Sequence, residues 1–545
     1  MQRYFKILLP LLLSIAVAGG VLLGIKIEQR TSVKPHGTST SFFQPDKISL
    51  LLKLIQRDYV DSIDQTEIAE KVIPEILDEL DPHSTYIPAS QMKAVSEEMR
   101  GNFSGIGVQF VMQKDTVLIT DVLSGGPSKE IGILAGDRIV EVDGRNIAGT
   151  KTSQDTIVTL LKGKKGTLVN VMVHRPGYPD LLDFTITRGE IPLFSVDVAY
   201  KITDNIGLIK VNRFAESTYE EFVRAIIELS QLGAQKLIVD LRGNSGGSLQ
   251  GVIQMVDEFL PQGRLIVYTE GKSRNRNDFY SSAKGLWTDK DVAVLIDEFS
   301  ASASEIFAGA IQDNDRGIII GRRSFGKGLV QEQIPFFDGS ALRLTVARFY
   351  TPSGRCIQNS YENGVEAYYD DYHERLIQSQ HNQADTISRS DSLKYQTIGG
   401  RTVFGGGGIT PDFHVAVDTT GINRFFSAVA SQNLVYHFAF EYADQHRSEL
   451  LEQNDYSSLD TYLHKTDLFS DLLKHIKARG IKYTSEELEE SKLLLQTQLH
   501  AYVCRNIFGD DAFYPIIFQI DKVVEKSVEL LQNNWEAEKV AAINR

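Results

Sequence analysis

Residues 292–320 read VAVLIDEFSASASEIFAGAIQDNDRGIII. Residues 292–297 are an apolar run that ends in Asp297, which is typical of a strand buried on both faces of a sheet. Small and apolar residues over 302–313 favour a helix, and the isoleucines at 318–320 favour another strand. A strand, a helix and a strand in close succession predict α/β architecture.

A second unit of the same kind precedes this one in the chain. Residues 206–211 and 236–241 each have the composition of a buried strand. Between them, Ser217 and Glu220 have the spacing of a capping box at the start of a helix. The apolar face of that helix contains Phe222, Ile226 and Leu229. We expect the two units to share one sheet.

The rest of the chain divides by composition into further segments. Apolar residues at helical spacing follow a polar linker, short β-rich runs with glycine turns come next, and helix-forming residues dominate after Pro411-Asp412. The predicted boundaries are a signal or transmembrane segment over 1–30, a linker over 31–45, a helical segment over 46–98, a β-rich domain over 99–190, the α/β domain over 191–415 with a surface insertion at 359–402, and a helical extension over 416–545.

Composition excludes several classes of function. The chain has 545 residues and a formal charge of −14, with no sustained basic stripe, which argues against nucleic acid as a partner. Its cysteines, Cys356 and Cys504, are too few for a disulfide framework and form no C-x-x-C pattern, so we expect neither a structural metal nor a cofactor.

The first residues indicate export. Arg3 and Lys6 precede an uncharged apolar run over 7–25, which is about the length needed to span a bilayer. We expect an uncleaved single-pass anchor in the inner (cytoplasmic) membrane, with the remainder on the exported, periplasmic side. Ala16-Val17-Ala18 resembles a cleavage site, so secretion to the periplasm after cleavage stays an alternative.

Ser302 lies where a buried strand turns into a helix. Such a position exposes a hydroxyl while the first amides of the helix point toward any developing oxyanion. The same residue also begins the sequence Ser302-Ala303-Ser304-Glu305, which satisfies a capping box in which serine serves only the backbone. Taken alone, the serine favours the capping interpretation. It can be a nucleophile only if another residue acts as a base and removes its proton.

The usual base for serine is histidine, and none occurs between His174 and His373. A Ser/His/Asp site within the α/β segment is therefore excluded unless a histidine comes from another module. Lysine can replace histidine when burial lowers its pKa. Lys327 lies between two glycines at the start of a strand-like run, and Gln331 falls on the same face of that strand, where it could orient the amine.

These residues belong to a series of motifs in a fixed order. The series is Asp81-Pro82-His83-Ser84, DLRGNSGG at 240–247, SASASEI at 300–306, SFGKGLVQ at 324–331 and TPSG at 351–354. Together they resemble the C-terminal processing peptidases (tail-specific proteases) of serine peptidase family S41. Within 99–190, FSGIGV at 103–108 and AGDRIVEVDG at 135–144 resemble a PDZ domain. The resemblance covers about 45 to 415.

The resemblance implies a fold and roles for particular residues. The fold is a multidomain α/β one, with a crotonase-like or ClpP-like peptidase core and an inserted PDZ-like domain. Ser302 is implied as the nucleophile, Lys327 as the general base and Gln331 as the residue that holds the lysine. Asp313 matches a further acidic position that supports activity. The implied oxyanion hole consists of the Gly246-Gly247 turn and the amide of Ala303, and the resemblance leaves open which of the two glycines donates.

The PDZ-like domain implies that the partner is a peptide or protein with a free C-terminus. A glycine-rich turn before a strand offers amides to a terminal carboxylate while the peptide adds as a strand. The residues in that position are Gly105, Ile106, Gly107 and Val108. The implied function is a serine endopeptidase that cleaves exported proteins with accessible C-termini, without metal or nucleotide.

Two departures from the family pattern and several alternatives stay open. Ser245 stands where the family often has proline, and Cys356 stands near a usual serine. A membrane-anchored PDZ scaffold without activity is one alternative, and a related hydrolase of esters or thioesters is another. An adaptor protein and self-association through the terminal helices are further partners that the sequence leaves open.

Overall fold

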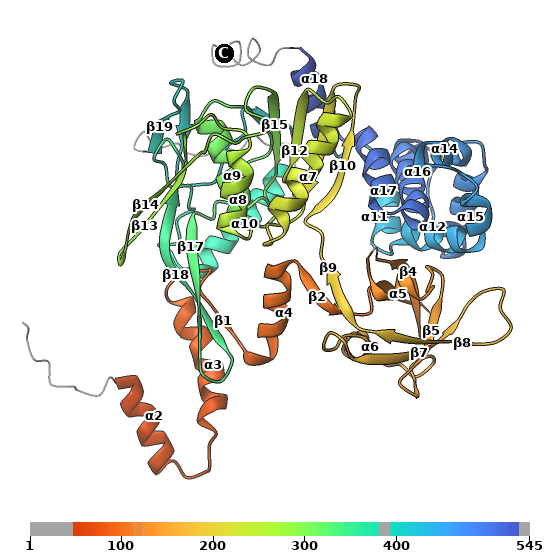
Figure 1. Cartoon of the computed structure of the whole chain (residues 1–545), viewed down its shortest axis with the longest axis horizontal. Helices are drawn as coiled ribbons and strands as arrows, with labels where there is room; N and C mark the ends of the chain where they lie inside the picture. The colour runs from red at the N-terminus through yellow and green to blue at the C-terminus, as the bar shows by residue number, and fades with distance from the viewer. Residues whose placement is uncertain (1–46, 114, 124, 381–392, 534–545) are drawn as a thin grey trace, which may run out of the picture. The chain divides into compact units, whose positions relative to one another are not determined.

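The computed structural model describes residues 47–113, 115–123, 125–380 and 393–533 (Figure 1). The predicted signal segment and linker lie outside these residues. The chain divides into two compact units at residue 72. The first unit contains α2 (Lys47–Asp58), in which no residue is buried, and the start of α3 (Gln65–Asp78). Across the described ranges, no helix is both long and apolar enough to cross a membrane.

A six-stranded sheet forms the centre of the α/β domain. Its order is β10-β11-β12-β15-β16-β21, with parallel pairing from β11 onward and an antiparallel first pair. The strands are β10 (Val196–Lys201), β11 (Ile206–Val211), β12 (Lys236–Asp240), β15 (Asp291–Ile296), β16 (Ile318–Gly321) and β21 (Phe413–His414). The predicted shared sheet is therefore present, and the α/β fold class is confirmed.

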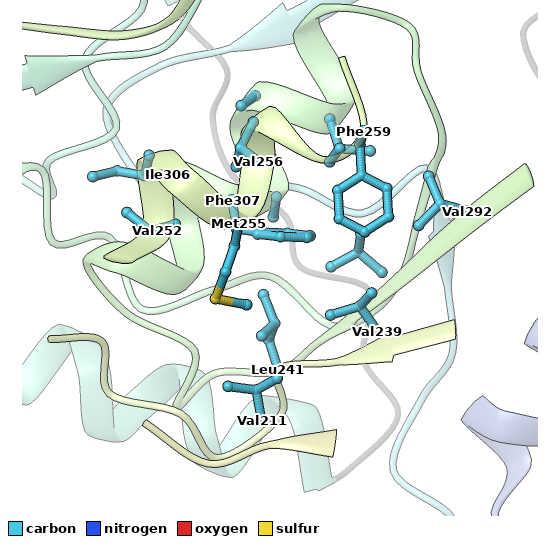
Figure 2. Packing of buried hydrophobic residues seen from close by; sticks show 14 of the residues in the cluster. Val211, Val239, Leu241, Val252, Met255, Val256, Phe259, Val292, Ile306 and Phe307 are labelled. Carbon is cyan, nitrogen blue, oxygen red and sulfur yellow. The ribbon is translucent and has the colours of Figure 1, made fainter. Parts of the chain in front are cut away.

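Alternate residues of these strands enter two different cores, because side chains along a strand point to opposite faces. One face packs against α7 (Thr218–Gln231), α8 (Leu249–Asp257) and α9 (Ala303–Asp313). Figure 2 shows Val239 and Val292 of the sheet facing Phe259 and Phe307. The rings of these two phenylalanines meet edge to face with centroids 5.5 Å apart. This packing fixes the start of α9, where Ser302 lies.

The second face of the sheet is covered by α18 (Lys522–Gln532), through Val524 and Leu530 among others. The helical extension therefore returns to the α/β domain. Arg242, at the end of β12, joins the two by pairing with buried Asp240 at 2.8 Å and with Asp521 at 2.8 Å. Asp240 and Arg242 of the DLRG motif thus have structural roles.

A smaller antiparallel sheet carries the lysine segment. Its order is β1-β18-β13-β14, and β17 also pairs with β18. The strands are β1 (Thr85–Ile87), β13 (Leu265–Gly271), β14 (Arg274–Tyr280), β17 (Leu329–Pro335) and β18 (Ala341–Tyr350). The segment over 46–98, expected to be mainly helical, thus also supplies a strand, β1, before α4 (Ala89–Arg100).

The β-rich domain contains a sheet in the order β3-β4-β5-β7-β8, with β6 paired to β5. The elements are β3 (Val108–Gln113), β4 (Thr116–Val122), α5 (Pro127–Glu130), β5 (Arg138–Val142), β6 (Arg145–Asn146), α6 (Gln154–Leu161), β7 (Leu168–His174) and β8 (Leu182–Thr187). A separate pair, β2 (Asn102–Gly105) with β9 (Gly189–Pro192), connects the domain to the rest of the chain. In the described part of this sheet, β3 is an edge strand.

Helices with their own apolar core make up most of the predicted extension. They are α11 (Arg424–Ala430), α12 (Leu434–Gln445), α13 (Arg447–Leu450), α14 (Tyr456–Leu463), α15 (Leu468–Ala478), α16 (Ser485–Phe508) and α17 (Asp510–Ile517), followed by a 3-10 turn (Phe518–Ile520). The predicted insertion contains α10 (Val365–Gln380), β19 (Lys394–Gln396) and β20 (Thr402–Phe404).

One local prediction is wrong. Ser217 precedes α7 as expected, but its hydroxyl makes no cap hydrogen bond and donates instead to Glu221 at 2.8 Å. The Glu221 carboxylate also accepts from the amide of Ser195, at the entry to β10. A hydrogen bond to Glu221, which also contacts Ser195, therefore replaces the predicted capping box with Glu220.

Candidate active site

Ser302 occupies an unusual backbone position at the start of α9. Its φ is 54° and its ψ is −109°, a region that residues with a side chain rarely adopt. From Ala301 to Asp313, Ser302 alone is not buried. The strained turn therefore presents a serine at the surface of an otherwise closed segment.

The capping interpretation of Ser302 accounts for only part of the hydrogen bonding at this turn. Ser302 and Glu305 have the arrangement of a capping box, and the Glu305 carboxylate accepts a hydrogen bond from the Ser302 amide at 2.8 Å. The Glu305 amide, however, also donates to the Ser302 carbonyl at 3.0 Å. The start of the helix therefore does not depend on the serine hydroxyl alone.

Glu305 is the centre of a buried network that sequence reasoning treated only as a cap. Besides the Ser302 amide, its carboxylate accepts from the Ser324 hydroxyl at 2.6 Å, the Gly326 amide at 2.8 Å and the Lys327 amide at 2.9 Å. Complete burial raises the pKa of Glu305 to about 7, against these four bonds, which favour the carboxylate. One side chain thus connects the serine turn to the lysine loop.

The predicted contact between Lys327 and Gln331 is present. The lysine Nζ donates to Gln331 Oε1 at 3.1 Å, and Gln331 Nε2 donates in turn to the carbonyl of His83. Burial, helped by the charge of Arg343, lowers the pKa of Lys327. A lowered pKa increases the neutral fraction of the amine, which a general base requires.

His83 is a site residue that sequence reasoning missed. Its ring contacts the Tyr368 hydroxyl at 3.2 Å and lies 6.2 Å from the Phe325 ring. Asp81 holds this turn by accepting from the amides of His83 and Ser84, both at 2.8 Å. The Asp-Pro-His-Ser motif was the available signal, but nothing in the sequence placed it beside Lys327.

Burial, with the nearby charge of Lys327, lowers the pKa of His83 to about 4. The imidazole is therefore neutral near pH 7. In the described structure its ring hydrogen bond goes to Tyr368, whereas its main chain holds Gln331. This histidine from another module is thus a neighbour of the lysine.

The segment expected to be a surface insertion also contributes to the site. Tyr368 of α10 is only 3% exposed and packs against His83. Arg375 of the same helix donates to the carbonyls of Ser324 and Phe325, at 3.3 and 2.8 Å. Although most residues of α10 are exposed, as expected of a surface insertion, this helix also fastens the lysine loop.

The glycine turn after β12 lies against the serine turn. A Cβ on Gly246 would come within 2.8 Å of Ser302 Cβ and 2.9 Å of the Ala303 nitrogen, and its φ of 101° also favours glycine. The Gly246 amide donates to Asn244 Oδ1 at 2.9 Å. In the described part of the chain, the amides of Gly247 and Ala303 have no acceptor. Asn244, which the sequence did not single out, accepts from the Ala301 amide at 3.0 Å.

Asp313 has structural partners. Its buried carboxylate pairs with Arg355 at 2.7 Å and accepts from the Ser353 hydroxyl at 2.6 Å. It therefore anchors the TPSG motif at the far end of α9 from Ser302. Neither departure from the family pattern removes a reactive group: Ser245 is exposed, and Cys356 is a free, half-buried thiol.

The residues of the predicted peptide cradle form a tight turn into β3. Gly107 has a φ of 78°, and a Cβ there would lie 3.0 Å from the Gly126 backbone. The carbonyls of Ile106 and Gly107 accept from Ser128 and Leu123. Their own amides donate to no backbone carbonyl among the described residues. Val108 begins the edge strand.

Comparison with known proteins identifies the family. A model of peptidase family S41 matches residues 205–369, and a PDZ-domain model matches residues 104–186. The carboxy-terminal-processing protease of Bartonella bacilliformis is 35% identical over 347 residues, which are 63% of this chain and 79% of that protein. The chain belongs to peptidase family S41. It is a serine peptidase of the carboxy-terminal processing type and contains a PDZ domain.

Other similar proteins have the same description. Carboxy-terminal processing protease CtpA of Bacillus subtilis is 32% identical over 374 residues, covering 68% of this S41 peptidase and 79% of the relative. Among solved structures, a photosystem II D1 C-terminal processing protease is 27% identical, with a TM-score of 0.35 and coverage of 58% of this chain and 85% of that one. Residues 425–509 match a family of unknown function.

The Glu305 network gives a prediction for the S41 peptidase. Glu305→Gln replaces one carboxylate oxygen by an amide nitrogen, which cannot accept from the backbone amides. The serine turn and the lysine loop should then separate slightly, and a misplacement of this kind costs about a hundredfold in kcat. Steady-state kinetics on a peptide should show this loss with little change in KM. Unchanged kcat would contradict the connecting role of Glu305.

Proposed function

We propose that this S41 peptidase hydrolyses peptide bonds of exported proteins with Ser302 as nucleophile and Lys327 as general base. The observation that carries the proposal is the Glu305 carboxylate, which binds the amides of both residues. Ser302 is half-buried, unlike the fully buried residues that follow it in α9, and the Lys327 amine lies in a half-buried place held by Gln331. A serine nucleophile and a neutral amine are thus supplied by one rigid network.

In the proposed reaction, the neutral Lys327 amine takes the proton of the Ser302 hydroxyl as the serine oxygen attacks a peptide carbonyl. The ammonium then gives this proton to the leaving amine, and an acyl-enzyme remains. Water, deprotonated by the same amine, then attacks the acyl-enzyme, and the ammonium returns this proton to the Ser302 oxygen as the acid product leaves. Gln331 keeps Nζ in place by accepting one of its hydrogen bonds, and the His83 carbonyl fixes Gln331.

The oxyanion of the tetrahedral intermediate needs preorganised donors. The amides of Ala303 and Gly247 are the donors we assign, because neither has an acceptor in the described structure. Gly246 has a different role, since its own amide serves Asn244. Its missing side chain permits the close approach of the two turns. Asp313 acts only by anchoring α9.

The PDZ domain supplies recognition of the substrate. The turn at Ile106 and Gly107 has two amides without backbone acceptors, and β3 beside it has a free edge in the described sheet. A peptide can add to such an edge as a strand while its terminal carboxylate binds the amides. The apolar run over 7–25, after two basic residues, further supports a membrane-anchored enzyme that acts on the exported side.

The dyad is tested by cleavage of an unstructured protein. Ser302→Ala and Lys327→Ala should each lower kcat by about a thousandfold or more, and the double variant should be no worse, because the residues act as a unit. Lys272→Ala, at an exposed lysine, is the matched control and should cleave normally. Full cleavage by either site variant would exclude the dyad, whereas no cleavage by the parent would favour a scaffold.

The pH dependence separates lysine from histidine. Below its pKa Lys327 holds a proton and cannot act as a base, so kcat/KM should rise with pH through its lowered pKa. His83, with a pKa of about 4, stays neutral over this range and should add no limb. His83→Gln should therefore keep the same limb as the parent in a pH–rate profile. A limb that disappears in this variant would assign the base to His83.

Recognition of C-termini is tested with paired substrates. A peptide with a free C-terminal carboxylate and its C-terminal amide differ only in the group that the cradle would bind. Hydrogen bonds to a charged group contribute about 1.5–3 kcal/mol, so the amide should have a kcat/KM at least about tenfold lower. Equal kcat/KM for both peptides would show that the PDZ domain does not read the terminal carboxylate.

A further inference from the structure

Two histidines and an aspartate come together in the helical region after the peptidase domain. Asp460 lies on α14, and His464 follows four residues later at the end of that helix, on the same face. His500 faces them from α16 and is 2% exposed. One potential ligand atom from each of the three residues lies within 4.8 Å of the others.

The distances are compatible with one ion held between the three side chains. Asp460 Oδ1 lies 2.8 Å from His500 Nδ1 and 3.7 Å from His464 Nε2. Zinc bonds to histidine nitrogen and carboxylate oxygen are about 2.0–2.2 Å, which puts neighbouring tetrahedral ligands about 3.3 Å apart. The two observed distances lie on either side of that value. Small side-chain movements would therefore complete the geometry.

The surroundings hold the ligands and leave a path to solvent. His500 is fixed within α16, between the buried residues Leu499 and Ala501. The ring of His464 lies 4.4 Å from the ring of His500, while its side chain is 56% exposed. A hydrogen bond between Asp460 and His500 would be enough to explain why His500 is buried. It would not explain why His464 also points at the Oδ1 atom of Asp460.

We propose that Asp460, His464 and His500 bind one divalent transition-metal ion of the zinc class. Two imidazole nitrogens and one carboxylate oxygen are ligands that zinc accepts, and three protein ligands leave a fourth position for water. The ion would join α14 to α16 and so stabilise the helical region. This site shares no residue with the peptidase centre, so it stands or falls independently of the proposed reaction.

The test uses the full chain with Ser302→Ala, which prevents self-cleavage, after removal of metal with a chelator. Calorimetric titration with ZnCl₂ should show one ion per chain, and Co²⁺ should give ligand-field absorption bands of a nitrogen and oxygen site. Asp460→Asn, which keeps an oxygen for His500, and His464→Ala should each weaken zinc binding by about tenfold or more. His437→Ala, at an exposed histidine in the same region, should bind as the parent does.

Thermal unfolding provides a second readout and a check on folding. Zinc should raise the melting temperature of the parent, because an ion that binds only the folded state stabilises it. The exposed His464→Ala variant should melt like the metal-free parent and should not respond to zinc. No zinc binding by the parent, or equal affinity in the parent, Asp460→Asn and His464→Ala, would overturn the proposal and leave an ordinary Asp–His pair.

Discussion

The arrangement of the site depends on one buried carboxylate. Glu305 is removed from water, which is costly for a charge unless hydrogen bonds replace the lost solvation. The replacement comes from the Ser302 amide on one side and from Ser324, Gly326 and Lys327 on the other. Because the donors belong to two separate segments, satisfying this buried carboxyl group holds the serine turn and the lysine loop together.

Each of these segments is fixed in turn by a different sheet. The serine turn follows β15 and begins α9, whose buried face packs in the central core. The lysine loop leads into β17 of the antiparallel sheet, where β1 also pairs with β18 and brings His83 to Gln331. The site is thus assembled from the N-terminal segment, the α/β core and α10. Such convergence places reactive groups on rigid elements, as preorganised catalysis requires.

Much of the fold followed from local patterns. The apolar runs at 206–211, 236–241 and 292–297 are strands of one sheet because a doubly covered parallel sheet demands continuous apolar residues. The contact between Lys327 and Gln331 followed from the period of a strand. In contrast, His83 lies 244 residues before Lys327 in the chain, and only tertiary packing places them together.

The missed residues share a physical cause. Glu305 has the spacing of a cap, and its other three donors come from a loop that the local sequence does not identify. Ser217 likewise pairs with Glu221 because that carboxylate also serves Ser195. Asp460, His464 and His500 follow no compact ligand motif, since two helices bring them together. Where the hydrogen-bond partners of a side chain lie far away in the sequence, the spacing of residues along the chain does not predict its contacts.

The central claim is that Lys327 activates Ser302. A fluorophosphonate, which reacts with activated serine hydroxyls, tests it without any assumption about substrate or PDZ binding. Peptide mass spectrometry should place the adduct on Ser302, and Lys327→Ala should slow labelling by about a hundredfold or more, the usual contribution of a general base. Labelling at another residue, or at the same rate in Lys327→Ala, would contradict the account.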